Sequence, residues 1–352
     1  MSKGIQQYKF KEPFVTESGS AISKPEVAYQ TWGELNKTRD NVILVCHALT
    51  GNTAADEWFK GIWGKGKTLD PQQHFIICPN VLGSCYGSSG PTSINPETSE
   101  PYRADFPTIT IRDMVRLQQR LMDELQITGI EMVIGGSMGG MQALEWAIMD
   151  DRPQSAVLIG MGKAHSPWAI GISHAQRQAI YNDPNWKEGY YSEEHPPKEG
   201  LGLARMIAMI SYRTDADYEN KFGREPQPET DQYQVESYLN YQGKKLVERF
   251  DAVSYVRLTE AMDSHDIARN RSSYRQVLGK IDIPVMVVGI DTDLLYPVQE
   301  QKELADLLPN GRYRLIQSEH GHDAFLIEFE QLNNILVPFL TEKPTSTIYP
   351  QQ

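Results

Sequence analysis

Long apolar runs are absent from this chain of 352 residues. A bilayer-spanning helix needs about 20 apolar residues, so we expect no membrane span, and the first residues lack the apolar segment of a signal peptide. Cysteine is scarce, because Cys46, Cys78 and Cys85 are an odd number without metal-ligand spacing. Cys46 and Cys78 end apolar runs and are expected to be buried thiols. The composition therefore excludes a disulfide scaffold and favours a reducing cytoplasm.

Positive charge is also in short supply. The chain has 34 Lys and Arg against 46 Asp and Glu, which gives a net charge of −12. This balance argues against nucleic acid and against an anionic membrane surface as partners. Apart from His320 and His322, the histidines have no metal-type partner at four-residue spacing, so no metal site is expected. Hydrophobic residues make up 40% of the chain, enough for a large core.

Ser137 stands in a sequence that predicts a nucleophile on a tight turn. Residues 132–134 are an apolar run typical of a buried strand, and residues 141–148 have helical spacing. Between them, Gly135, Ser137 and Gly139 fit G-x-S-x-G, the pattern of a strand–turn–helix nucleophile elbow. The helix N-terminus would place N–H groups beside the serine oxygen. The alternative is a glycine-rich turn that binds phosphate or nothing, and the flanking strand and helix favour the nucleophile.

Strands and helices alternate over much of the chain, which predicts an α/β fold with a mostly parallel central sheet and helices on both faces. Residues 5–32 are expected to form antiparallel edge strands, with 27–32 the clearest. Further strands are expected at residues 41–46, 74–79, 155–160, 283–290 and 313–316, and helices at 111–125, 298–308 and 325–340.

The alternation lapses between residues 164 and 280. Helices are expected there at residues 166–181, 200–212 and 235–251, separated by polar loops. A helical insertion of about a hundred residues between strands of one sheet indicates a lid over a site. The predicted organisation is a core of residues 1–163 and 281–342, a lid of residues 164–280, and a tail of residues 343–352.

Two further side chains follow predicted strands and complete a candidate Ser–Asp–His triad. Acyl transfer needs an activated alcohol, a base of near-neutral pKa and an acid that holds the base. Asp293 follows the strand at 283–290 and stands four residues before Pro297; Asp291 is the alternative acid. His322 follows the strand at 313–316, and His320 is the alternative base, otherwise a loop residue bonded to backbone. This order along the chain is that of α/β-hydrolases.

Two loops that follow predicted strands bear on the same site. Residues 47–51 form a turn whose backbone N–H groups could complete an oxyanion hole, so the expected donors are the amides of Leu49 and Met138. The alternative is an ordinary strand-to-loop turn. Residues 80–91 are rich in small residues and have some likeness to a phosphate cradle. No Walker lysine follows them, and they are interpreted as a structural or site-wall loop.

At these residues the chain resembles the homoserine O-acetyltransferases, over nearly its whole length. The segments that carry the resemblance are HALTG (47–51), NVLGSCYGSSGP (80–91), GGSMGGMQ (135–142), ARMIAMISYR (204–213) and GHDAFL (321–326). The resemblance implies an α/β-hydrolase fold with an inserted helical lid, working as a homodimer. It implies transfer of an acetyl group from acetyl-CoA to the hydroxyl of L-homoserine, on the way to methionine, with acetyl-CoA as co-substrate and no permanently bound cofactor.

Carried over by resemblance, Ser137 is the nucleophile, with Asp293 and His322 as its partners. Arg205 then holds the homoserine carboxylate and Asp323 its ammonium group. Tyr212 and Thr50 match further substrate contacts. Without the family, a surface-paired Arg205 on a lid helix and an Asp323 that caps the last helix would be preferred. A guanidinium that grips a carboxylate with two hydrogen bonds suits a zwitterionic substrate.

One position bears on the acyl donor. Succinyl-transferring relatives tend to carry an arginine two residues after the triad acid, and this chain has Leu295 there. A leucine cannot pair with the extra carboxylate, so acetyl is expected. The alternatives are homoserine O-succinyltransferase and serine O-acetyltransferase, then an esterase with the same triad. The remaining alternative is a non-catalytic ligand-binding domain, which the complete set of triad residues disfavours.

Overall fold

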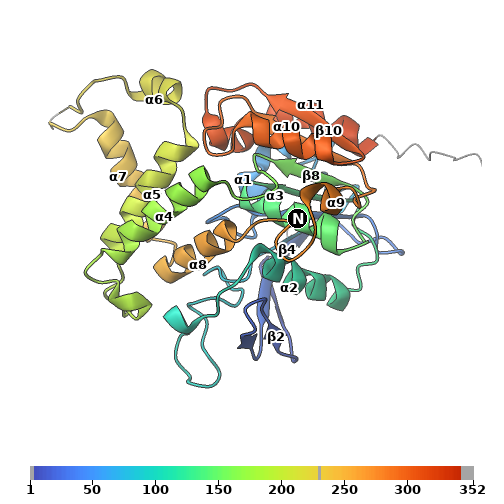
Figure 1. Cartoon of the computed structure of the whole chain (residues 1–352), viewed down its shortest axis with the longest axis horizontal. Helices are drawn as coiled ribbons and strands as arrows, with labels where there is room; N and C mark the ends of the chain where they lie inside the picture. Colours follow the sequence, from blue (N-terminus) through green and yellow to red (C-terminus); the bar gives the residue numbers. More distant parts are fainter. Residues whose placement is uncertain (1–3, 229–230, 342–352) are drawn as a thin grey trace, which may run out of the picture.

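The computed structural model describes residues 4–228 and 231–341, and the expected tail at 343–352 lies outside them. An eight-stranded sheet in the order β1-β4-β6-β5-β7-β8-β9-β10 forms its centre (Figure 1). Its strands are β1 (Gln6–Lys9), β4 (Glu26–Trp32), β5 (Val42–Cys46), β6 (Phe75–Pro79), β7 (Met132–Gly136), β8 (Ala156–Ile159), β9 (Val285–Ile290) and β10 (Gly311–Ile316). A separate small sheet pairs β2 (Phe14–Val15) with β3 (Ala21–Ile22).

Strand direction divides the central sheet into a short antiparallel edge and a long parallel part. β4 pairs antiparallel with β1 and with β6. From β6 through β5, β7, β8 and β9 to β10, neighbouring strands are parallel. The predicted mostly parallel sheet with an antiparallel N-terminal edge is therefore confirmed. Because parallel strands end at the same edge of a sheet, the loops after β5, β7, β9 and β10 come together there.

Side chains along each strand alternate between the two faces of the sheet. In β5, Val42 and Leu44 join one apolar cluster, whereas Ile43 and Val45 join the other. The first cluster includes residues of α2 (Ile111–Glu124), α3 (Met138–Met149) and α10 (Val298–Leu307), and the second includes residues of α1 (Ala55–Trp58), η1 (Lys60–Ile62) and α11 (Phe329–Thr341). The sheet is thus buried on both faces, as predicted. A further short turn of helix, η2 (Arg103–Asp105), lies between β6 and α2.

Helices fill most of the segment between residues 164 and 280. They are α4 (Pro167–Tyr181), η3 (Lys187–Gly189), α5 (Lys198–Tyr212), α6 (Asp215–Phe222), α7 (Gln234–Val247), α8 (Ala252–Asp263) and α9 (Tyr274–Leu278). α5 packs against α4 and α7, and Figure 1 shows α4 to α7 grouped beside the sheet. The helix predicted at 235–251 is too long, because Asp251 caps the next helix and accepts a hydrogen bond from the Ser254 N–H at 2.7 Å.

The closing helix predicted at 325–340 begins later than expected. η4 (Gly321–Leu326) is a turn of 3-10 helix, and α11 starts at Phe329. Ile327 separates the two with non-helical angles, φ −128° and ψ −50°. Gly321 opens η4 with φ +62°, a conformation that glycine adopts readily. His322 consequently sits on a tight turn. Among the described helices, none is both long and apolar enough to cross a membrane.

Candidate active site

Ser137 lies on a sharp turn between β7 and α3. Its φ of +55° is rare for a residue with a side chain. The Ser137 N–H donates to the Ile159 carbonyl at 2.8 Å, which ties the turn to β8. A Cβ added to Gly135 would lie 2.2 Å from the Gly139 backbone, and one added to Gly139 would lie 2.1 Å from the Cys46 carbonyl oxygen. The close approach of strand and helix therefore requires glycine at these two positions, which is the geometry that the G-x-S-x-G pattern predicts.

A buried Asp–His pair lies at the same edge of the sheet. The Nδ1 atom of His322 is 2.7 Å from Oδ2 of Asp293, and both side chains are almost fully buried. The other oxygen of Asp293 accepts hydrogen bonds from the N–H groups of Leu295 and Tyr296, each at 2.9 Å. Asp291, the alternative acid, instead accepts a backbone N–H at 3.0 Å. The geometry thus selects Asp293 and His322 from the two pairs that the sequence left open.

Electrostatics favour the charged form of His322. Burial lowers the pKa of His322, but the charge and hydrogen bond of Asp293, with a smaller contribution from Asp323, raise it above its ordinary value of 6.5. Gly160, which follows β8, leaves room for the pair. A Cβ there would lie 3.3 Å from the imidazole Cε1 and 3.5 Å from Asp293 Oδ2. The protein therefore provides a base that is held in place and shifted toward protonation.

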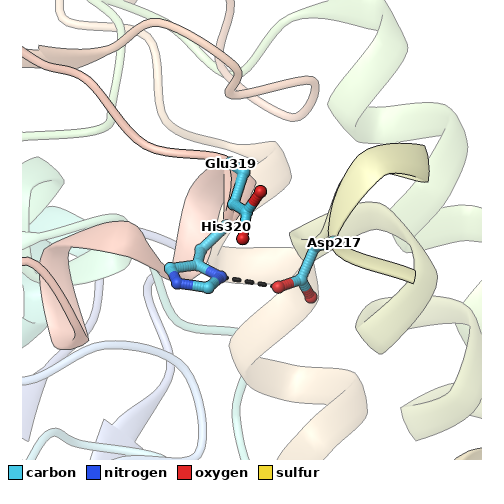
Figure 2. Close-up of side chains that lie close together, drawn as sticks. All are labelled: Asp217, Glu319 and His320. Atoms are coloured by element: carbon cyan, nitrogen blue, oxygen red, sulfur yellow. Dashed lines mark hydrogen bonds and ion pairs between the residues drawn. The ribbon is translucent and has the colours of Figure 1, made fainter. Parts of the chain in front are cut away.

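His320 makes a different pair. The sequence predicted a loop residue bonded to backbone, but its Nδ1 lies 2.6 Å from Asp217 Oδ1 on α6 (Figure 2). Together with Glu319, these groups bring potential metal ligands within 4.8 Å of one another. Asp217 also pairs with Arg213 at 3.4 Å, so it already has a cation of the protein beside it. We interpret the cluster as a link between α6 and the loop before η4.

A cavity of about 470 Å³ joins the predicted site residues. The predicted residues in its wall are Leu49, Thr50, Ser137, Arg205, Tyr212, His322 and Asp323. Exposed Glu57 and Lys245 belong to the same wall as buried Ser137, so the cavity connects the serine with the surface. Its size lies within the range of about 300–1,000 Å³ that is usual for small-molecule sites.

The two residues predicted to supply the oxyanion hole adjoin the site: Met138 follows Ser137 in the chain, and Leu49 lines the same cavity. Met138 is the first residue of α3, and Leu49 follows β5 by three residues. Among the hydrogen bonds found between described residues, neither amide acts as a donor. His47 anchors the Leu49 turn, because its Nδ1 lies 3.0 Å from the Ala48 carbonyl and its Nε2 accepts the Val81 N–H at 3.1 Å. The loop at residues 80–91 therefore has a structural role beside the site, as interpreted from the sequence.

A cation and an anion line the same cavity. Arg205 lies on α5, and no carboxylate among the described residues forms an ion pair with it. Asp323 lies on η4, next to His322, and pairs with Arg213 at 3.1 Å. Neither the surface pair for Arg205 nor the helix cap for Asp323 is found. Arg213, which follows Tyr212 in the chain, was not predicted to be a site residue, because no sequence pattern distinguishes it.

Tyr296 is a second residue that the sequence did not single out. Its ring centroid lies 5.3 Å from that of His322, and its hydroxyl is 3.0 Å from Nδ1 of His165. Burial lowers the pKa of His165 to about 3, so this imidazole is neutral near pH 7. Nε2 of His165 lies 3.5 Å from the Ser173 hydroxyl and 3.7 Å from Asp263. Tyr296 and His165 therefore share one buried hydrogen bond.

The Tyr296 hydroxyl also interacts with the Ser137 side chain. Burial raises the pKa of Tyr296 well above its ordinary value, and the hydrogen bond with the Ser137 side chain acts in the opposite direction. The sequence shows only that a tyrosine stands three residues after Asp293. Its role could not be predicted, because it depends on contact with a histidine more than a hundred positions earlier.

Comparison with known proteins places this geometry in a family. The family described as alpha/beta hydrolase fold matches residues 41–329. The homoserine O-acetyltransferase of Chloroherpeton thalassium is 51% identical over 98% of this chain and 94% of its own length. That of Trichormus variabilis is also 51% identical, over 96% of this chain and 94% of its own.

Solved structures give the same picture. The crystal structure of homoserine O-acetyltransferase from Bacillus anthracis superposes with a TM-score of 0.90 at 28% identity, covering 97% of this chain and 98% of that one. The structure of esterase E22 has a TM-score of 0.89 at 25% identity, covering 97% and 100%. The backbone alone therefore does not separate transfer from hydrolysis. With about half of its residues shared over nearly the full length of curated relatives, the chain belongs to the homoserine O-acetyltransferase family of the α/β-hydrolase fold.

Proposed function

We propose that this protein transfers an acetyl group from acetyl-CoA to the hydroxyl of L-homoserine, a step toward methionine. The observation that carries the proposal is the joint presence of Ser137, His322, Arg205 and Asp323 in the wall of one cavity, with Asp293 behind the imidazole. A nucleophile and base alone would suit an esterase. The added cation and anion suit the carboxylate and ammonium groups of an amino acid.

In the first half-reaction, His322 accepts the proton of the Ser137 hydroxyl as the serine oxygen attacks the thioester carbonyl. The amides of Leu49 and Met138 stabilise the negative charge on the carbonyl oxygen. The C–S bond then breaks, His322 returns its proton to the leaving sulfur, and coenzyme A departs. The enzyme is left as an ester between Ser137 and the acetyl group.

In the second half-reaction, homoserine binds with its carboxylate on Arg205 and its ammonium on Asp323. Tyr212 and Thr50, which line the same cavity, provide further contacts. His322 removes the proton of the homoserine hydroxyl, whose oxygen attacks the acetyl-serine ester. The Ser137 oxygen leaves and takes the proton back from His322. The bound hydroxyl competes with water through proximity, and the helical segment at 164–280 acts as a lid that limits access of solvent.

The acyl donor and the assembly are parts of the same proposal. Leu295 is a buried residue with an uncharged side chain, so this position supplies no cation for the second carboxylate of a succinyl group. This supports acetyl over succinyl as the donor group. We further propose that the protein works as a homodimer in the cytoplasm, with acetyl-CoA as a co-substrate and without a resident cofactor or metal.

Ser137→Ala tests the nucleophile. The variant should lose homoserine-dependent release of CoA thiol and the acetyl adduct on the intact protein in mass spectrometry. Retained turnover would refute the assignment.

The esterase alternative is tested with the wild-type protein by supplying acetyl-CoA with and without homoserine. Thiol release that does not depend on homoserine would favour hydrolysis. A panel of acetyl-CoA and succinyl-CoA against homoserine and serine separates the remaining alternatives.

A further inference from the structure

The outer wall of the active-site cavity carries two cations that the proposed reaction does not use. Lys245 lies on α7, and Arg249 follows the end of that helix; both are exposed and both line the cavity. Since both are exposed and both belong to the wall of this cavity, they lie at its rim. Arg205 is the cation deeper in the same cavity.

Neither of the two rim cations is neutralised by a carboxylate among the described residues. Arg249 donates to the Thr50 carbonyl at 2.9 Å and to the Tyr86 hydroxyl at 2.6 Å, which fixes its position beside the Leu49–Thr50 turn. The Lys245 ammonium lies 6.0 Å from the Tyr241 ring centroid.

The charge of the whole chain makes this rim unusual. The net charge is −12, so a polyanion is repelled by the protein as a whole and needs a local positive field to bind. Glu57 is the one carboxylate among the exposed residues of the described cavity wall. Since Arg205 and Asp323 match the two charges of an amino acid, the two rim cations remain for another anion.

We propose that Lys245 and Arg249 bind the phosphate groups of the coenzyme A thioester. The inference rests on the proposed function and extends it to the recognition of the donor. A cavity of about 470 Å³ lies in the lower half of the range of about 300–1,000 Å³ for drug-sized ligands. A larger coenzyme therefore places its acyl end at Ser137 and leaves its phosphates at the rim, where Lys245 and Arg249 stand.

The test compares two acetyl donors that differ in their phosphates. Acetyl-CoA carries them, and S-acetyl-N-acetylcysteamine keeps the thioester but has none. Lys245→Gln removes one charge while keeping most of the side chain. Lys244→Gln, at the exposed neighbouring position on α7 and outside the cavity wall, removes the same charge as a control. Lys245 is the better target because Arg249 also holds the Thr50 carbonyl.

Lys245→Gln should raise KM for acetyl-CoA about three- to tenfold, as expected for the loss of one exposed charge-assisted contact. The loss in kcat/KM should be clearly smaller for the short donor, and KM for acetyl-CoA should depend less on ionic strength than in the wild type. Lys244→Gln should leave KM for both donors within twofold of the wild type.

Equal losses for the two donors in Lys245→Gln, or the same rise in KM in Lys244→Gln, would overturn the proposal. Calorimetric binding of CoA to the unreacted protein tests the site without turnover, and equal affinity in the wild type and Lys245→Gln would also overturn it. Failure of the proposed function gives a different result, namely a wild-type protein that releases no thiol in response to homoserine from either donor.

Discussion

Gly160 offers a sharp test of how the proposed catalytic pair, Asp293 and His322, is positioned. It follows β8 with φ +55°, and an added methyl group would lie 3.3 Å from His322 Cε1, 3.4 Å from Nδ1 and 3.5 Å from Asp293 Oδ2. The contacts with the imidazole are tighter than ordinary van der Waals contact. The ring would have to move by a few tenths of an ångström, away from the position set by its 2.7 Å contact with Asp293.

Gly160→Ala is therefore expected to affect stability and rate for separate reasons. A side chain in the left-handed region costs about 1–2 kcal/mol, which lowers Tm by about 1–3 °C in a chain of 352 residues. Displacement of a catalytic group by about 1 Å can cost about a hundredfold in rate. A shift of a few tenths of an ångström should then reduce kcat about three- to tenfold, as measured by homoserine-dependent thiol release at saturating substrates.

Gly223 provides the matched control. It has φ +53° and ψ −147°, and no atom lies within 4 Å of an added Cβ, so Gly223→Ala introduces backbone strain at positive φ without a contact in the site. Both variants should lose stability in a thermal melt, and only Gly160→Ala should lose kcat. An unchanged kcat in Gly160→Ala, or an equal loss in Gly223→Ala, would refute the argument that the space beside the imidazole matters.

Two further variants test Asp293 and Tyr296. Asp293→Asn should reduce kcat by about 10³–10⁴-fold, because the imidazole loses the partner that fixes its tautomer; retention of more than a tenth of the wild-type rate would contradict this role. The same change should move the acidic limb of the pH–rate profile to lower pH. In the wild type this limb lies above pH 6.5, because the pKa of His322 is raised. In Asp293→Asn the pKa of His322 should fall, because the carboxylate charge no longer opposes the effect of burial. Because the folded-state pKa of His322 is raised, the pair with Asp293 contributes fully to stability below about pH 6.5. That contribution is lost as the pH rises through the folded-state pKa. The Tm difference between wild type and Asp293→Asn should therefore shrink between pH 6 and pH 8. Tyr296→Phe should lower the free energy of unfolding by about 1–3 kcal/mol, because Nδ1 of the buried His165 loses its hydrogen-bond partner; an unchanged Tm would show that another group satisfies this nitrogen.

Local sequence patterns were sufficient for the elements that carry the chemistry. Ser137 could be placed because a short apolar run, small residues and a helical repeat follow one another directly, and each is a local property of the chain. Asp293 and His322 were found in the same way, as polar residues just after predicted strands. Parallel strands end at one edge of the sheet, so the order of strands and helices already implied that these loops meet.

Patterns failed where a boundary depended on contacts across the fold. The helix predicted at 235–251 ends early because Asp251 caps α8, and the closing helix is interrupted at Ile327. A capping residue and a loop residue look alike in sequence, since both are short polar side chains. Helices α6, α8 and α9 were likewise not predicted, because their sequences resemble those of the loops around them.

The sequence by itself determined the α/β architecture, the insertion between strands and the residue types at the strand ends, because hydrophobic periodicity and glycine placement act over a few neighbouring residues. Only the tertiary structure brought the preferred Asp293 and His322 to within 2.7 Å of each other and gave Asp291 and His320 other partners. It also brought Tyr296 to His165, Asp323 to Arg213, and Lys245 to the rim of the Ser137 cavity. Such contacts join residues far apart in the chain, and they form only when the sheet and the inserted helices have packed together.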